Sequence, residues 1–305
     1  MTSLQPFRRS EHNPIITAAD LPFPALGVLN PGAAEVDGQI VLLLRVENPT
    51  GYSDIYVARS PNGVASWQID PCPILQHGLD AWRYEAWGCE DPRVTYLPED
   101  ECWYVTYVAS SAMGPVVALA RTKDFTRAER VSLLGATNDK DGVLFPQKFS
   151  GRYAILHRPD AGGHEHIWSA YSPDLVHWGE PHCVLMGGFG PTWDAVKVGA
   201  GPPPISTSSG WLLIFHGVKL YAGEMLYRVG LALLDKNTPH QVIGRSRGCV
   251  FQPEMPYELS GAVPNIVFPA GALLRDDELW MYYGAADSCV CLATAKLRDL
   301  LGYLT

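Results

Sequence analysis

The 305-residue sequence predicts an all-β fold, a five-bladed β-propeller with a central active-site cavity, formed by one domain over residues 1–305. Two observations predict this fold. Short apolar segments alternate with turn residues along the whole chain, and one strand pattern recurs five times. A third observation agrees with them, because long amphipathic helical patterns are missing from the sequence.

The apolar segments are rich in Val, Ile, Tyr, Trp and Leu, several of which are enriched in strands. Glycine (29 residues) and proline (25 residues) are spread evenly between these segments and mark their ends. Clear examples of predicted strands are residues 39–46, 103–109, 153–157, 211–216 and 278–283. Only residues 295–301 are expected to form a short helix.

The recurring pattern is a strand that carries an alanine and leads into a small polar turn. The five alanines are Ala58, Ala120, Ala170, Ala232 and Ala293. Their spacings of 62, 50, 62 and 61 residues suit a four-stranded blade with long loops. The alternative is a β-sandwich with accidental similarity, but sandwiches rarely show five regular repeats. No linker interrupts the series, which favours a single domain.

Composition excludes several classes of protein. The net charge of −9 repels a polyanion, so no nucleic-acid partner is expected. No run of 18 apolar residues is present, and the first residues lack the apolar core of a signal peptide, so no membrane association is expected. Seven scattered cysteines without a CxxC pair favour reduced thiols and predict a cytoplasmic protein.

Two adjacent carboxylates, Glu90 and Asp91, precede Pro92 at the start of a predicted strand. Because successive side chains on a strand point to opposite faces, these two are not expected to face the cavity equally. A carboxylate held near the apolar Trp87 could have a raised pKa and act as an acid. The alternative is an Asp-Pro turn with a salt bridge to Arg93.

Three further polar residues suit a bound sugar. Asn30 offers a donor and an acceptor to a hydroxyl group, and Asp287 can bind a pair of hydroxyls. Arg45 ends an apolar strand and needs a partner there, for which an ion pair with Glu47 or Asp91 is an equally good account. Aromatic residues that could stack on sugar faces are Trp82, Tyr84, Trp87, Trp193 and Tyr221. Most tryptophans in such folds, however, belong to the core.

Several further polar residues, most of them cationic, stand near the ends of apolar strands in this acidic chain. They are Lys140, Arg158, Lys197, His216 and Tyr227. Each one alone is more often structural, but in a propeller such strand ends converge at one mouth. A cluster of this kind suits a small dianion, because arginine supplies a planar fork and lysine a point charge. Inorganic phosphate is the natural candidate.

Metal and nucleotide motifs are not found, so neither a metal nor an organic cofactor is expected. The segment His164-Glu165-His166 would place both imidazoles on one face of a strand. A solvated loop is the better interpretation of this segment.

Several short motifs, taken together and in order, make the chain resemble the mannoside phosphorylases of glycoside hydrolase family 130. The resemblance runs from residue 30 to residue 287. The motifs are Gly88-Cys89-Glu90-Asp91-Pro92-Arg93, Val143-Leu144-Phe145-Pro146, His157-Arg158-Pro159, Lys197-Val198-Gly199-Ala200-Gly201-Pro202-Pro203, His216-Gly217-Val218 and Val263-Pro264-Asn265. No single motif would be specific.

The resemblance implies a five-bladed propeller and an inverting reaction with Asp91 as the only protein acid. Phosphate, the co-substrate, would attack the anomeric carbon, and the Asp91 proton would reach the bridging oxygen through the mannose 3-hydroxyl. The residues implied to contact phosphate are Lys140, Arg158, Lys197, His216 and Tyr227, and those implied to contact mannose are Asn30, Arg45, Asp91 and Asp287. Lys140 stands where some members carry arginine.

These observations predict a β-mannoside phosphorylase that produces α-mannose 1-phosphate from a mannoside or manno-oligosaccharide. An inverting β-mannosidase on the same scaffold and a non-catalytic carbohydrate-binding propeller are the alternatives. The intact cationic set favours phosphorolysis over hydrolysis. The linkage (β-1,2 or β-1,4) and the acceptor sugar depend on loops 77–84, 160–165 and 219–224, and a homo-oligomer is possible.

Overall fold

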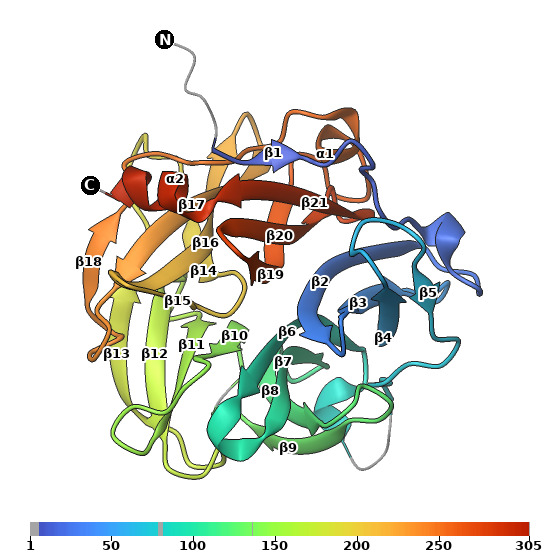
Figure 1. Cartoon of the computed structure of the whole chain (residues 1–305), viewed down its shortest axis with the longest axis horizontal. Helices are drawn as coiled ribbons and strands as arrows, with labels where there is room; N and C mark the ends of the chain where they lie inside the picture. Colours follow the sequence, from blue (N-terminus) through green and yellow to red (C-terminus); the bar gives the residue numbers. More distant parts are fainter. Residues whose placement is uncertain (1–5, 79–81, 136, 305) are drawn as a thin grey trace.

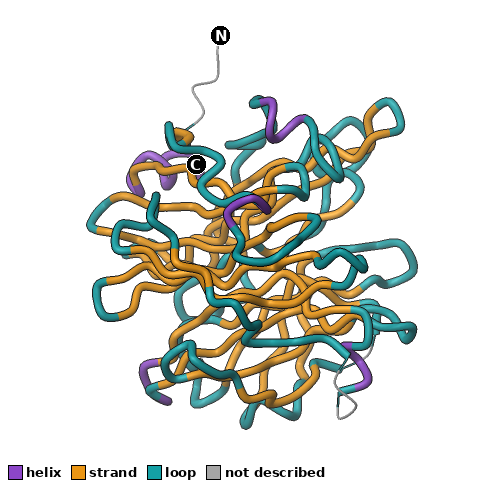
Figure 2. Tube along the Cα trace, turned by 90° about the vertical axis from the view of Figure 1, so that its right-hand side faces the viewer, coloured by secondary structure: helices purple, strands orange, loops and turns teal. Residues whose placement is uncertain are grey.

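The computed structural model describes residues 6–78, 82–135 and 137–304. Over these residues the fold is all-β, as predicted, and the helical segments are short (Figure 2). The helical segments are α1 (Pro256–Leu259), α2 (Leu297–Leu301), η1 (Ala18–Asp20), η2 (Arg83–Glu85), η3 (Pro98–Asp100) and η4 (Gly302–Leu304). Helix α2 confirms the helix expected within 295–301. Helix α1 escapes prediction from sequence, because four residues are too few to establish a helical period.

The longest sheet contains eight strands and consists of two antiparallel meanders. Its strands are β2 (Gly27–Val36), β3 (Gln39–Glu47), β4 (Ser53–Ser60), β5 (Gln68–Ile69), β6 (Gly88–Leu97), β7 (Cys102–Ser110), β8 (Val116–Thr122) and β9 (Glu129–Leu133). One parallel pairing, between Ser53 and Gly88, joins the two meanders. Two of the predicted four-stranded units are therefore halves of one sheet, because the starts of β4 and β6 lie close enough to pair.

Three further sheets follow along the chain, and among the described residues none of the sheets closes on itself. The first contains β10 (Asp139–Leu144), β11 (Tyr153–Pro159), β12 (Ile167–Ser172) and β13 (Gly179–Leu185). The second contains β14 (Lys197–Ala200), β15 (Ile205–Thr207), β16 (Gly210–Tyr221), β17 (Glu224–Leu234) and β18 (Val242–Arg245). The third contains β19 (Val267–Arg275), β20 (Glu278–Ala285), β21 (Cys289–Lys296) and β1 (Arg8–Arg9).

Strand β1 joins the beginning of the chain to its last sheet. It pairs with β21, so that Arg8 faces Thr294 and Arg9 faces Ala293. The Arg9 guanidinium donates hydrogen bonds to the carboxylate of the fully buried Glu258 and to a neighbouring backbone carbonyl. A buried carboxylate needs such a partner, so this contact holds β1 in place.

The five recurring alanines occupy equivalent positions. They lie on β4, β8, β12, β17 and β21, each of which is the third strand of its meander. Each is at most 6% exposed and faces an apolar residue on the second strand, as Ala232 faces Leu213. All five second strands predicted from the apolar segments are present as β3, β7, β11, β16 and β20.

The core lies between neighbouring groups of strands. One apolar cluster packs Leu212 and Val229 against Val267 and Met281, and another packs the last group against the first through Leu292 and Leu42. Figure 1 shows the groups around a common centre, with β2, β6, β10, β14 and β19 nearest to it. Asn30, Asp91, Lys140 and Lys197 lie on four of these central strands, and the neighbouring strands β3, β11, β16 and β17 carry Arg45, Arg158, His216 and Tyr227.

Three of the central strands contain the same irregularity. The register with the next strand shifts between Leu29 and Gly32, between Glu90 and Arg93, and between Lys140 and Val143. The residue with positive φ in each shift is Asn30 (48°), Asp91 (49°) or Asp141 (53°). Asparagine and aspartate tolerate this left-handed conformation better than most residues, and a bulge re-aims the side chain that it carries.

Candidate active site

A cavity of about 220 Å³ lies among the central strands. Eight of the nine residues predicted from the sequence line it: Asn30, Arg45, Asp91, Lys140, Arg158, Lys197, Tyr227 and Asp287. The ninth, His216, is fully buried behind the wall, with Nε2 3.5 Å from Asp141 Oδ2. Residues that are far apart in the sequence therefore meet at one point.

Asp91 is buried and doubly hydrogen-bonded. The Asn30 side-chain amide donates to Asp91 Oδ1 over 2.8 Å, and Arg45 Nη1 donates to the same oxygen over 3.1 Å. Burial alone would raise the pKa of Asp91, but Arg45 and Arg93 outweigh it and hold the pKa below its ordinary value. The prediction of a raised pKa beside Trp87 is wrong for Asp91, because Trp87 is 49% exposed and lines a different pocket.

Glu90 and Asp91 both reach Arg45, although a regular strand would point them apart. Arg45 Nη1 lies 3.3 Å from Glu90 Oε2 as well as 3.1 Å from Asp91 Oδ1. The bulge between Glu90 and Arg93 causes this, because it breaks the alternation of side chains at Asp91. Arg45 is therefore paired with a carboxylate, one of the two roles left open by the sequence.

Arg93 does not form the predicted salt bridge with the Asp91 carboxylate. It is fully buried, and its Nη1 donates to the backbone carbonyl of Asp91 over 2.7 Å. Its Nη2 donates to Asp141 Oδ1 over 2.9 Å. Arg93 therefore links the bulges that carry Asp91 and Asp141.

Asp141 is a central residue of the site that sequence reasoning missed. Its Oδ2 lies 2.7 Å from Arg158 Nε, and its other oxygen accepts from Arg93. Burial opposes the charge of Asp141, but Arg158 and Arg93 hold its pKa well below its ordinary range. A signal was present, because Asn30, Asp91 and Asp141 are spaced by 61 and 50 residues, nearly as the first three alanines are.

Glu165 is the second missed residue, and the prediction of a solvated loop is wrong for it. Its backbone forms a parallel bridge with Lys197, which draws it into the cavity wall. Its carboxylate contacts Arg158 and lies 3.7 Å from Lys197 Nζ. The two cations are thus held by carboxylates in this structure.

The cationic residues differ in burial and in proton affinity. Arg158 is 5% exposed, whereas the side chain of Lys140 is 40% exposed and its Nζ lies 4.0 Å from Glu90 Oε2. Burial and the nearby Arg158 lower the pKa of Lys197. Burial lowers the pKa of His216 to about 3, so its imidazole is neutral near neutral pH.

Asp287 has the opposite electrostatic setting to Asp91. It lies in the turn between β20 and β21, with a φ of 47°. Burial, and then repulsion from Asp91, raise the pKa of Asp287 from 3.8 to about 6. Among the carboxyl groups that line the cavity, Asp287 thus has a raised pKa, whereas Asp91 and Asp141 have lowered ones.

The raised pKa of Asp287 predicts a pH-dependent contribution to stability. The folded state binds this proton more tightly than the unfolded state, so the contribution is present below about pH 4 and is lost as the pH rises through about 6. The free energy of unfolding of the wild type, minus that of Asp287→Asn, should therefore decrease between pH 4 and pH 6.5 in urea titrations. Asp276→Asn, at an exposed turn residue with a φ of 56°, is the matched control. A difference for Asp287→Asn that is independent of pH would contradict this expectation.

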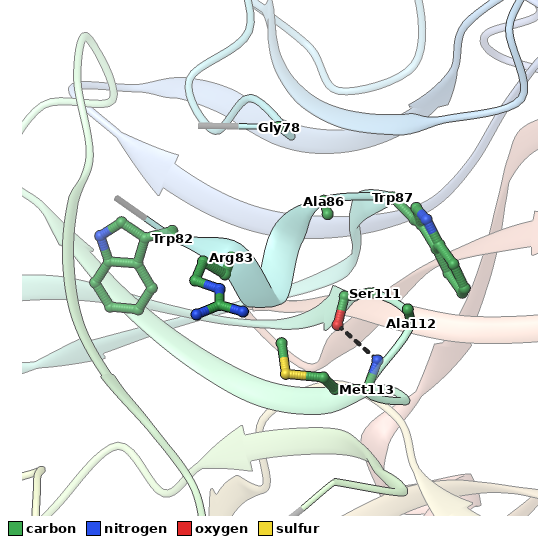
Figure 3. Close-up of a pocket in the computed structure, with 8 residues that line it drawn as sticks. All are labelled: Gly78, Trp82, Arg83, Ala86, Trp87, Ser111, Ala112 and Met113. Carbon is green, nitrogen blue, oxygen red and sulfur yellow. Dashed lines mark hydrogen bonds between the residues drawn. The ribbon is translucent and has the colours of Figure 1, made fainter. Parts of the chain in front are cut away.

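The predicted aromatic residues do not gather at the cavity. Trp82 and Trp87 line a separate pocket (Figure 3), and Tyr84 and Tyr221 are exposed. Trp193 packs on Phe215, with ring centroids 5.6 Å apart. Part of the predicted specificity loop 77–84, residues 79–81, lies outside the described residues.

Among the described residues, no group of three or more His, Cys, Asp or Glu side chains is arranged to hold a metal ion. None of the described helices is long and apolar enough to cross a membrane.

Comparisons with known proteins match almost the entire chain. The family model that matches residues 12–305 is that of glycoside hydrolase family 130, described as beta-1,4-mannooligosaccharide phosphorylase. The beta-1,2-mannobiose phosphorylase of Listeria innocua is 32% identical over 97% of this chain and 98% of the relative. The beta-1,4-mannooligosaccharide phosphorylase of Ruminococcus albus is 32% identical over 97% of this chain and 90% of the relative.

A solved structure agrees with these sequence matches. The beta-1,2-mannobiose phosphorylase from Listeria innocua, in complex with beta-1,2-mannobiose, superposes with a TM-score of 0.89 at 32% identity. The match covers 98% of this chain and 99% of that one. On the family model, the relatives and the shared fold, this chain belongs to glycoside hydrolase family 130.

Proposed function

We propose that this chain catalyses the inverting phosphorolysis of β-mannosides and releases α-mannose 1-phosphate. The observation that supports this most is the lining of one cavity by two kinds of group. Asp91, a carboxylate that accepts a hydrogen bond from Asn30, and the cations Arg158 and Lys197 all line it. The relatives named above, which are mannoside phosphorylases, support the same reaction.

The reaction is a direct displacement at the anomeric carbon. An oxygen of phosphate attacks this carbon from the face opposite the leaving group, and the bond from the carbon to the bridging oxygen breaks. Asp91 supplies the proton for the bridging oxygen, relayed through the mannose 3-hydroxyl. The proton that the attacking hydrogen phosphate carried is released to solvent, and it balances the proton that Asp91 takes up again as the next substrates bind. One carboxyl group is then sufficient, in contrast to the carboxylate pair of ordinary inverting glycosidases.

The lowered pKa of Asp91 fits this role only if bound substrates raise it. A phosphate dianion bound by the cations would add negative charge near Asp91 and oppose the field of Arg45. A bound sugar would also exclude water from the carboxylate, which disfavours its charged form. We therefore propose that Asp91 acquires its proton as the substrates bind.

We assign roles to the other residues of the cavity on the same basis. Asn30, Arg45 and Asp287 would bind mannose hydroxyls beside Asp91. Lys140, Arg158, Lys197 and Tyr227 would bind phosphate, with His216 behind them. Asp141 and Glu165 would hold the cations in place before phosphate arrives, since both contact Arg158.

We also propose that the five groups of strands are the blades of a single five-bladed propeller over residues 1–305. The packing of the last group on the first supports this architecture. The cavity would then lie on the propeller axis. A cytoplasmic location and association into homo-oligomers stay predictions.

The decisive experiment measures the dependence of the reaction on phosphate. The protein is incubated with β-1,2-mannobiose, β-1,4-mannobiose or mannosylglucose, with and without phosphate, and both mannose 1-phosphate and mannose are assayed. Mannose 1-phosphate should form from at least one of these substrates, and only with phosphate. Release of mannose at an undiminished rate without phosphate would indicate a β-mannosidase instead. Binding without any product would indicate a carbohydrate-binding propeller.

A further inference from the structure

A second pocket, separate from the active-site cavity, is largely apolar. It has a volume of about 380 Å³ and is lined by Gly78, Trp82, Arg83, Ala86, Trp87, Ser111, Ala112 and Met113. Trp82 and Trp87 lie toward opposite ends of the group, with Arg83 and Ser111 between them (Figure 3). Aromatic walls with a few polar groups are typical of small-molecule sites.

The segment that carries the two tryptophans is held by a buried ion pair. Glu85, which is fully buried, accepts hydrogen bonds from Arg130 Nε over 2.8 Å and from the Tyr107 hydroxyl. Arg130 also donates to the Gln76 carbonyl over 2.9 Å. Gln76 and Glu85, which lie on either side of Trp82 in the sequence, are therefore both attached to strands β7 or β9 of the second meander. Such attachment preorganises side chains for binding.

The pocket is continuous with the catalytic strand. Trp87 precedes Glu90 by three residues, which in an extended chain places its Cα about 10 Å from that of Glu90. The Trp87 amide donates to the Ser110 carbonyl over 2.8 Å, so the wall formed by residues 111–113 continues β7, the partner strand of β6. The pocket therefore lies at the same end of β6 and β7 as Glu90 and Asp91.

We propose that this pocket binds the second sugar unit on the leaving-group side of the mannoside, with its apolar ring face against Trp87. This inference rests on the proposed function for the identity of the sugar. In this arrangement the glycosidic bond that is cut lies at Asp91. The first sugar unit of the leaving group extends from this bond toward Glu90, and the second sugar unit reaches the pocket. Arg83 and Ser111 offer hydrogen bonds to its hydroxyl groups. The enzyme should thus favour trisaccharides over disaccharides.

The test compares affinities for sugars of two lengths in an inactive background. Binding of mannobiose and mannotriose, in both the β-1,2 and the β-1,4 series, is measured by calorimetry on Asp91→Asn with and without Trp87→Ala. Loss of the ring contact should weaken mannotriose binding about tenfold, which corresponds to about 1.4 kcal/mol. Mannobiose binding should change by less than about twofold in the same comparison.

Two control variants accompany Trp87→Ala. Trp87→Phe should restore most of the affinity for mannotriose, and Tyr96→Ala, a partly exposed aromatic at the other end of β6, should leave both affinities unchanged. Equal losses for the two sugar lengths, or no loss for either, would overturn the inference. A selective loss for mannotriose in an enzyme that forms no mannose 1-phosphate would refute the proposed function and leave the pocket assignment standing.

Discussion

Asp91→Asn should reduce the rate of mannose 1-phosphate formation by about 10³-fold at saturating substrate and phosphate, because general acid catalysis contributes roughly 10²–10⁴-fold. The substitution removes the only carboxyl group proposed to protonate the bridging oxygen. Asparagine has nearly the same shape, so it can still contact Asn30 and Arg45, whose present contacts are 2.8 Å and 3.1 Å long. The loss should therefore appear in kcat rather than in the fold.

The measurement is a steady-state assay of mannose 1-phosphate, accompanied by thermal unfolding of both proteins. Asp276→Asn, which exchanges the same residue types at an exposed turn, should leave kcat unchanged. If Asp91→Asn retains more than about a tenth of the wild-type rate, this carboxyl group is not the acid. A loss of less than tenfold is smaller than the roughly 10²–10⁴-fold contribution of general acid catalysis.

Arg158→Ala should raise the KM for phosphate by about 100-fold, because a charge-assisted hydrogen bond contributes about 1.5–3 kcal/mol. The KM for the mannoside should change little, since the sugar contacts lie around Asp91. The same substitution should lower the free energy of unfolding by about 3–5 kcal/mol, because it leaves the buried Asp141 without one of its cations.

Arg158→Lys separates these two effects. Lysine keeps the charge beside Asp141 and should recover much of the stability, but it lacks the planar fork and should leave the KM for phosphate elevated. Progress curves at several phosphate concentrations provide the KM, and urea unfolding provides the stability. An unchanged KM for phosphate in both variants would place the nucleophile elsewhere.

The parts of the fold that could be predicted from the sequence are those in which a local pattern of residues repeats. The strands at 39–46 and 211–216 were predictable because apolar runs end at glycine, proline or small polar residues. The alanines were predictable as equivalent positions because all five are buried in third strands, where a regular meander places them. The single pairing of Ser53 with Gly88 has no such signal, because it depends on how two meanders pack.

The residues that form the site could be predicted from the sequence better than their pKa values and mutual contacts. Arg158 and Lys197 stand at the ends of strands that converge, so their meeting follows from the topology. The low pKa of Asp91 depends on Arg45, which is 46 residues away and reaches it only because a bulge re-aims the carboxylate. Glu165 belongs to a loop, and only the bridge of its backbone with Lys197 brings it inward.

The pairing of β1 with β21 has a consequence for biosynthesis. Arg8 and Arg9 leave the ribosome almost three hundred residues before their partners Thr294 and Ala293. The sheet of β19, β20 and β21 therefore stays incomplete until β21 has been synthesised and β1 has docked on it, and Arg9 meets Glu258 only after this late pairing. A bulky fusion placed directly before β1 would interfere with this final step, so a long spacer at that end should improve the yield of folded recombinant protein.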